Sequence, residues 1–186
     1  MLECGQRECG LMYTFVDSVL DRPCIPTIIG PPLNYPQPRY DEPRNRIYLI
    51  GSLRNPEIPK IGKALRSAGF EVFDDWYAAG PEADDRWQAY ETQRGRTYSE
   101  ALQGYAAKNV YAFDKRHMDR CDIGVLVLPA GKSGHMELGW MKGKGKRTYV
   151  LVNEDPERWD VMYNFHDGVA HAYEDLVTML KGSNGL

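Results

Sequence analysis

The sequence has no long apolar run, no excess of positive charge and few cysteines, and each shortage excludes a class of protein. Without about 20 consecutive apolar residues, no transmembrane helix is predicted, and we expect no contact with a membrane. A net charge of -3 does not provide the basic face that a nucleic-acid polymer requires. No basic segment followed by an apolar one opens the chain, so no secretion signal is predicted. We therefore expect a soluble, cytoplasmic protein.

The four cysteines are Cys4, Cys9, Cys24 and Cys121, and they are too unevenly spread to suggest a disulfide framework. None belongs to a C-x-x-C pair, which is the spacing typical of zinc sites. We therefore expect reduced thiols and predict neither a bound metal nor a cofactor. A metal held by Cys4 and Cys9 is the alternative.

Proline is concentrated near the beginning of the chain. Residues 1–45 contain the stretch "DRPCIPTIIGPPLNYPQPRYDEPRN", and proline is excluded from helix interiors and central strands. This composition predicts a proline-rich arm that wraps over its own domain or over a neighbouring subunit. A partly disordered tail is the alternative. The remaining residues, 46–186, have the length of one ordinary domain.

From residue 46 onwards, strand patterns alternate with helix patterns. Ile58, Ile61, Leu65 and Ala68 recur at helical spacing, and the long segment from residue 84 to 122 predicts one or two helices interrupted near Gly95. The predicted strands are "RIYLIGS", "FEVFDDW", "IGVLVLP" and "RTYVLV". This alternation predicts a parallel sheet with helices on both faces and a ligand site at the carboxyl ends of the strands.

The segment "LVLPAGKSGHMELGW", residues 126–140, suggests three different chemistries. A Walker loop would need a glycine where Leu126 stands, so the "GKS" is not predicted to bind a nucleoside triphosphate. A zinc deaminase would need a later P-C-x-x-C, but no cysteine follows Cys121, so His135 is not predicted to be a ligand. The third interpretation is that Glu137, after a glycine turn, attacks an electron-poor carbon, as the nucleophile of a retaining glycosidase does.

Such a nucleophile needs groups that hold the sugar, manage the leaving base and stack on it. Candidates lie at other strand ends. Tyr48 and the "GSLR" turn belong to the first strand, Asp74, Asp75 and Trp76 end the second, and Asp119 and Asp122 flank the start of the third. Each candidate also has an interpretation without a functional role. Tyr48 could be a core aromatic, and Asp119 and Asp122 could cap a helix or be solvated.

Together these residues resemble the nucleoside 2-deoxyribosyltransferase superfamily, including its branch of nucleoside 5'-monophosphate N-glycosidases. The resemblance covers residues 46–180, and the positions that match its motifs are Tyr48, Gly51, Ser52, Arg54, Asp122 and Glu137. It implies a flavodoxin-like fold and a homodimer or larger homo-oligomer whose sites are completed across subunits. It also implies that Glu137 attacks C1' of a nucleoside or nucleotide, that Tyr48 orients Glu137, and that Asp122 acts near the departing base or the sugar hydroxyls.

Two features distinguish the branches of this superfamily. Deoxyribosyltransferases place an acidic residue six positions before the glutamate, where this chain has Gly131. The "GSLR" turn instead resembles the monophosphate branch, in which Ser52 and Arg54 would hold a 5'-phosphate. Residues 132–134 would add to this cradle, namely Lys132, Ser133 and Gly134. Water or a second base would then resolve the glycosyl-enzyme intermediate.

Two further expectations concern the base and the class of protein. The acidic stretch from Asp74 to Trp87 is predicted to form a wall or lid over the base, with Asp75, Trp76 and Trp87 as contacts, because tryptophan offers a broad stacking surface. Asp119 is a further candidate for substrate binding.

The alternative function is a TIR-like module that binds a nucleotide, or binds and cleaves NAD, and signals through its oligomer.

Overall fold

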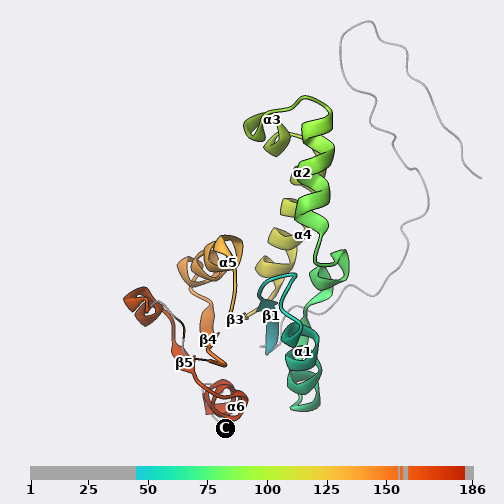
Figure 1. The fold of residues 1–186 in the computed structure, drawn as a ribbon. Helices are drawn as coiled ribbons and strands as arrows, with labels where there is room; N and C mark the ends of the chain where they lie inside the picture. Colours follow the sequence, from blue (N-terminus) through green and yellow to red (C-terminus); the bar gives the residue numbers. More distant parts are fainter. Residues whose placement is uncertain (1–44, 155, 157–158, 183–186) are drawn as a thin grey trace, which may run out of the picture. The chain divides into compact units, whose positions relative to one another are not determined.

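Five parallel strands form one sheet, and their order is β2-β1-β3-β4-β5 (Figure 1). The strands are β1 (Arg46–Ile50), β2 (Glu71–Phe73), β3 (Ile123–Val127), β4 (Arg147–Leu151) and β5 (Gly168–Ala170). This order is that of flavodoxin-like sheets, in which the order of successive strands reverses between β1 and β3 while all strands stay parallel. The predicted fold class is therefore confirmed. β5 was not predicted, because "GVA" is too short to carry a strand pattern.

The computed structural model describes residues 45–154, 156 and 159–182, all within the compact unit Glu42–Leu186. The predicted proline-rich arm and three of the four cysteines lie outside the described residues. Within these residues, no helix combines the length and the apolar character needed to cross a membrane.

Three helices follow strands closely: α1 (Glu57–Ser67), α5 (Lys132–Gly143) and α6 (Tyr173–Gly182). Between β2 and β3 the chain forms a short 3-10 turn, η1 (Asp75–Ala79), and then α2 (Ala83–Gln93), α3 (Tyr98–Leu102) and α4 (Tyr105–Arg120). The predicted break near Gly95 is present, at a φ of 70° that favours glycine. A second break at Gly104 divides the segment into three helices rather than one or two. A further 3-10 turn, η2 (Val161–Phe165), precedes β5.

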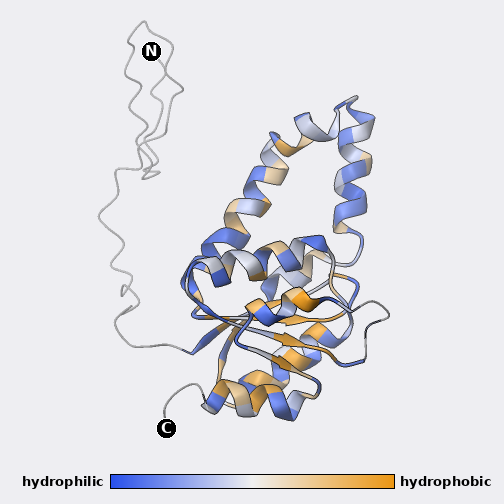
Figure 2. Cartoon of the chain, turned by 90° about the vertical axis from the view of Figure 1, so that its left-hand side faces the viewer, coloured by the Kyte–Doolittle hydropathy of each residue, from blue (hydrophilic) through white to orange (hydrophobic). Residues whose placement is uncertain are grey.

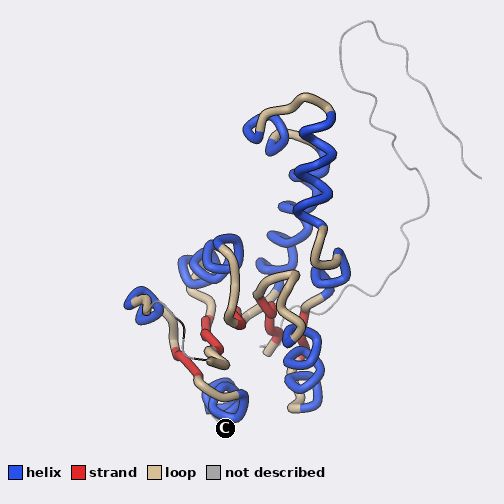
Figure 3. Tube along the Cα trace, in the orientation of Figure 1, coloured by secondary structure: helices blue, strands red, loops and turns tan. Residues whose placement is uncertain are grey.

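The helices cover the two faces of the sheet as separate layers (Figure 3). Side chains alternate along a strand, so Ile47 and Leu49 pack with α1 and α6. Tyr48 and Ile50 point to the other face, where they pack with α4 and α5. Figure 2 shows the apolar residues gathered in and around the strands. The position of Tyr48 therefore directs its side chain towards the α4–α5 layer.

Residues 83–120 form a helical hairpin, made of α2, α3 and α4, that extends beyond the sheet (Figures 1 and 2). Only the last part of α4 packs on the strands, where Met118 is buried. The tip is held by buried Glu91, whose carboxylate pairs with Arg96 at 3.0 Å, and by a capping box between Thr97 and Glu100. One continuous helix therefore joins the exposed part of the hairpin to the layer that covers the sheet.

Candidate active site

Tyr48, Asp114 and Glu137 come together on one face of the sheet, from β1, α4 and α5 respectively. Tyr48 is buried, and the two carboxyl groups are half-buried. The Tyr48 hydroxyl donates a hydrogen bond to the Asp114 carboxylate. Glu137 lies in the second turn of α5, because this helix already begins at Lys132. Glu137 therefore lies one turn inside its helix rather than directly after the glycine turn.

The cluster perturbs the pKa of each of its members. Burial, and then the neighbouring charge of Asp114, raise the pKa of Glu137 to about 7. Burial also raises the pKa of Asp114, against the opposing effect of the Tyr48 hydrogen bond. The pKa of Tyr48 is raised by burial and by the two negative charges beside it. A carboxyl group that titrates near neutral pH can exist in both protonation states during a reaction.

An aromatic stack fixes the distance between β1 and α4. The Tyr48 ring stacks on Phe73 at 5.4 Å between centroids, and Phe73 stacks on His117 at 3.9 Å. His117 lies one turn after Asp114 on α4. Because rings in offset stacks keep a defined separation, this arrangement holds Asp114 beside the Tyr48 hydroxyl.

Sequence reasoning missed Asp114, although its spacing contains a signal. Asp114 stands four residues before Met118, which is buried against the sheet, and residues four apart share a helix face. Glu137 has the same relation to buried Met141 on α5. A carboxylate on the buried face of a helix is uncommon without a specific role, so the two acidic residues could have been identified from the pattern of each helix.

The turn after β1 and the turn after β3 lie side by side. Asn55 is buried, and its side-chain amide donates to the Leu128 carbonyl at 3.4 Å. The Ser52 hydroxyl accepts a hydrogen bond from the Arg54 amide at 3.1 Å, which fixes the turn. The Arg54 guanidinium pairs with Asp85 at the start of α2, at 2.7 Å.

The glycines of these two turns permit close packing. A Cβ atom on Gly51 would lie 2.3 Å from Ile58, and one on Gly134 would lie 3.1 Å from both Ile50 and Leu126. Gly134 therefore allows the first turn of α5 to approach the sheet. This packing role is the alternative to the predicted contact between Gly134 and the substrate. Lys132 and Ser133 are exposed in the same turn.

The residues predicted to form a wall over the base are divided between several locations. Trp76 is half-buried, and its indole donates to the Leu49 carbonyl at 2.8 Å, which ties η1 to β1. Trp87 lies on α2 and meets Tyr98 edge to face at 6.5 Å. Asp75 lines a cavity of about 230 Å³ beside the sheet edge, together with Phe73 and His117. Asp74 pairs with Arg66.

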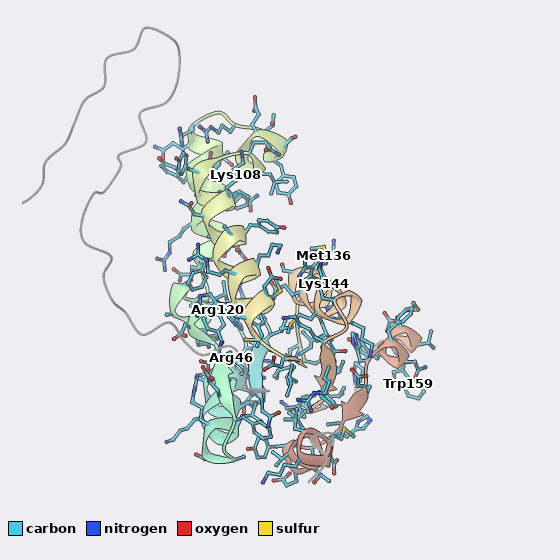
Figure 4. All side chains as sticks on the ribbon, turned by 180° about the vertical axis from the view of Figure 1, so that it is seen from behind. Arg46, Lys108, Arg120, Met136, Lys144 and Trp159 are labelled. Carbon is cyan, nitrogen blue, oxygen red and sulfur yellow. The ribbon has the colours of Figure 1, made fainter. Side chains whose placement is uncertain are left out.

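Asp119 and Asp122 lie towards the amino end of β3, where Arg46 and Arg120 are neighbours (Figure 4). The Asp122 carboxylate accepts a hydrogen bond from the Arg46 amide at 3.2 Å, which joins β1 to β3. Asp119 pairs with Lys115 in the last turn of α4. The structure brings neither of them into the cluster around Glu137, because residues that enter a strand lie opposite its carboxyl end.

Among the described residues, no group of three or more His, Cys, Asp or Glu side chains is arranged to hold a metal ion. Cys121 is buried, and burial raises the pKa of its thiol to about 12. This thiol is therefore protonated at neutral pH and is a poor metal ligand or nucleophile.

No protein-family model matches the chain, and no curated protein matches it in sequence. Similar solved structures include a conserved protein from Enterococcus faecalis V583, with a TM-score of 0.50 and 13% identity over 75% of this chain and 99% of that one. They also include a 2-deoxyribosyltransferase from Bacillus psychrosaccharolyticus, with a TM-score of 0.48 and 20% identity over 71% of this chain and 90% of that one. A third is a CMP N-glycosidase from Clostridium botulinum, with a TM-score of 0.41 and 13% identity over 73% of this chain and 98% of that one.

Two of these proteins bear the names of the two enzyme types that the sequence motifs resemble. Identities of 13–20% indicate at most a common fold, and TM-scores below 0.5 give no further weight to an activity. The function of this chain therefore depends on the geometry and charge of its own residues.

Proposed function

We propose that this protein cleaves the N-glycosidic bond of a nucleoside 5'-monophosphate, with Glu137 as nucleophile and a glycosyl-enzyme intermediate. The observation that carries the proposal is the convergence of Tyr48, Asp114 and Glu137, with the pKa of Glu137 raised to about 7 by burial and by the Asp114 charge. Most glycosidases use two carboxyl groups at one site, one to attack the carbon and one to transfer the proton.

In the first step, a carboxylate oxygen of Glu137 forms a bond to C1' as the bond from C1' to the base nitrogen breaks. The electron pair of that bond leaves with the base, which takes up a proton. Positive charge that develops on the sugar favours the ionised form of Glu137. Asp114 is suited to take up a proton from solvent and to pass it to the leaving base. Tyr48 orients Asp114 through its hydroxyl.

In the second step, water or another base attacks C1' and releases Glu137. When water attacks, its proton passes to the Asp114 carboxylate, and the products are the free base and a sugar 5-phosphate. Asp122 has no part in this proposal, because its carboxylate is bonded to the backbone of Arg46. The role that the sequence predicted for it is taken by Asp114.

The phosphate would bind at the neighbouring turns after β1 and β3. Ser52 and Arg54 belong to the first turn, and Lys132 and Ser133 belong to the second. The contact between Asn55 and Leu128 keeps these turns together, and cationic side chains with free backbone amides are the usual ligands of a phosphate.

The test is a panel of nucleosides, 5'-monophosphates and NAD, with chromatography to detect the free base. We expect base release from at least one monophosphate, and we expect Glu137→Gln to lower it by at least about 10³-fold while circular dichroism stays unaltered. The exposed Glu174→Gln on α6 is the matched control. Near-normal turnover in folded Glu137→Gln would refute the proposal, and cleavage of NAD alone would favour the TIR-like alternative.

We also propose that the protein is a homo-oligomer that associates through the helical hairpin. Several large apolar side chains are exposed there: Tyr90, Tyr98, Leu102, Tyr105, Val110, Tyr111 and Phe113. Apolar side chains gathered on one exposed element commonly mark an interface. Sedimentation analysis should show a dimer or larger assembly that Tyr111→Glu dissociates, whereas a monomeric wild type would contradict this proposal.

A further inference from the structure

The Arg54 guanidinium, which the proposed function directs towards a phosphate, is bonded to another group in this structure. Its Nη2 atom lies 2.7 Å from Oδ2 of Asp85, and both side chains are 63% exposed. The Arg54 backbone is fixed by the Ser52 hydroxyl. Only the side chain is therefore free to exchange one anionic partner for another.

Asp85 belongs to an acidic first turn of α2, together with Asp84. Arg86 in the same turn is engaged with Glu82 at 3.0 Å. Arg54 reaches this turn from a different part of the chain, 31 residues away. The negative charge around Asp85 therefore holds Arg54 when no other anion is present.

The pair between Arg54 and Asp85 is easily broken. Exposed ion pairs stabilise proteins little, because water screens the charges and ordering the side chains costs entropy. A phosphate dianion offers two charges and can accept parallel hydrogen bonds from one guanidinium. A phosphate bound at the turn can therefore displace the carboxylate, whereas a nucleoside without phosphate cannot.

We propose that Asp85 competes with the substrate phosphate for Arg54. Asp85 thereby lowers the preference of the site for phosphorylated over unphosphorylated sugars. This inference rests on the proposed function, because it assigns the Arg54 turn to a 5'-phosphate. Asp85 weakens the binding of every phosphorylated ligand by the strength of its bond to Arg54. It leaves the binding of nucleosides unaltered.

The experiment compares wild type with Asp85→Asn, Arg54→Ala and the double variant. Calorimetry measures the binding of ribose 5-phosphate and ribose, and kinetics measure KM for a nucleoside 5'-monophosphate and its nucleoside. We expect Asp85→Asn to tighten ribose 5-phosphate binding, and to lower KM for the monophosphate, by roughly two- to fivefold. Ribose and the nucleoside should show no change. In the Arg54→Ala background, Asp85→Asn should have no effect.

Asp84→Asn is the matched control, since it removes the same charge from the same exposed turn. Its effect on ribose 5-phosphate binding should be below twofold. The inference is overturned if Asp85→Asn weakens or does not alter binding, if Asp84→Asn matches it, or if its effect persists without Arg54. It is also overturned if wild type does not bind ribose 5-phosphate. Calorimetry measures binding and needs no turnover. A failure of base release would therefore reject the proposed function without deciding whether Asp85 competes for Arg54.

Discussion

Replacing Asp114 with asparagine should move the pH dependence of the reaction to lower pH. As the proposed nucleophile, Glu137 would act in its ionised form, so kcat/KM should rise with pH through the pKa of Glu137. Burial and the Asp114 charge raise that pKa from 4.5 to about 7, a difference that corresponds to roughly 3 kcal/mol. Burial is the larger cause of this rise. Removing the Asp114 charge should therefore reverse less than half of the rise and bring the pKa of Glu137 to roughly 6.

The consequence is measurable at one pH. At pH 6, wild type should retain about one tenth of its plateau kcat/KM, whereas Asp114→Asn should retain about one half of its own plateau. Because the substitution also removes the proposed proton carrier, its plateau should be lower than that of wild type. The ratio within each protein is therefore the quantity to compare, and the matched control is Asp175→Asn, an exposed carboxylate on α6.

A second measurement does not depend on turnover. In protein labelled with carbon-13 at the glutamate carboxyl groups, the Glu137 signal should titrate near pH 7 in wild type and at lower pH in Asp114→Asn. The low-pH side of the kcat/KM profile and the titration of the carbon-13 signal should both shift in Asp114→Asn. If both occur at the same pH as in wild type, Asp114 does not influence Glu137, and the proposed cluster is wrong. A wild-type signal that titrates near 4.5 would contradict the burial argument as well.

Three further predictions concern stability. The raised pKa of Glu137 means that the folded state binds more protons than the unfolded state between pH 4.5 and about 7, so this group's contribution to stability is lost as pH rises through that window. Glu137→Gln should therefore be more stable than wild type at pH 8, by about 1–3 kcal/mol, and equal melting temperatures at pH 8 would refute this. Arg96→Ala should lower the free energy of unfolding by about 1–3 kcal/mol, since it removes the close partner of buried Glu91; urea denaturation measures the loss, and an unaltered midpoint would show that the pair does not hold the tip. Trp76→Phe should cost about 1 kcal/mol through the lost bond to a β1 carbonyl, and thermal unfolding that matches wild type would count against it.

The parts of the fold that the sequence predicted are those in which burial repeats with a regular period. β3 is buried along its whole length, and its unbroken apolar run predicted this. In α1, Ile58, Ile61 and Leu65 are all buried at the predicted spacing. β5 has three residues and no such pattern, and it exists because it pairs with β4. Pairing of this kind is a tertiary effect that a short segment does not encode.

The candidate site was predicted in part for a similar reason. Tyr48 precedes one recognisable glycine turn and Glu137 follows another, whereas Asp114 stands inside a long helix without a motif around it. Asp122 was selected because it matches a motif of the superfamily that the sequence resembles, and the structure places it at the amino end of β3, where its carboxylate accepts a hydrogen bond from the Arg46 amide. Which side chains meet was decided by the packing of α4 over β1, and this packing depends on the stack between Phe73 and His117.

The continuity of α4 has a practical consequence for anyone who attaches this protein to a surface. The helix contains no glycine or proline, and Tyr105 near its exposed end is about 14 Å along the axis from Asp114. A rigid rod of this kind transmits a displacement from one end to the other. Immobilisation through the hairpin should therefore disturb the carboxyl cluster, whereas a linker on α6, across the sheet, should leave the geometry of that cluster intact.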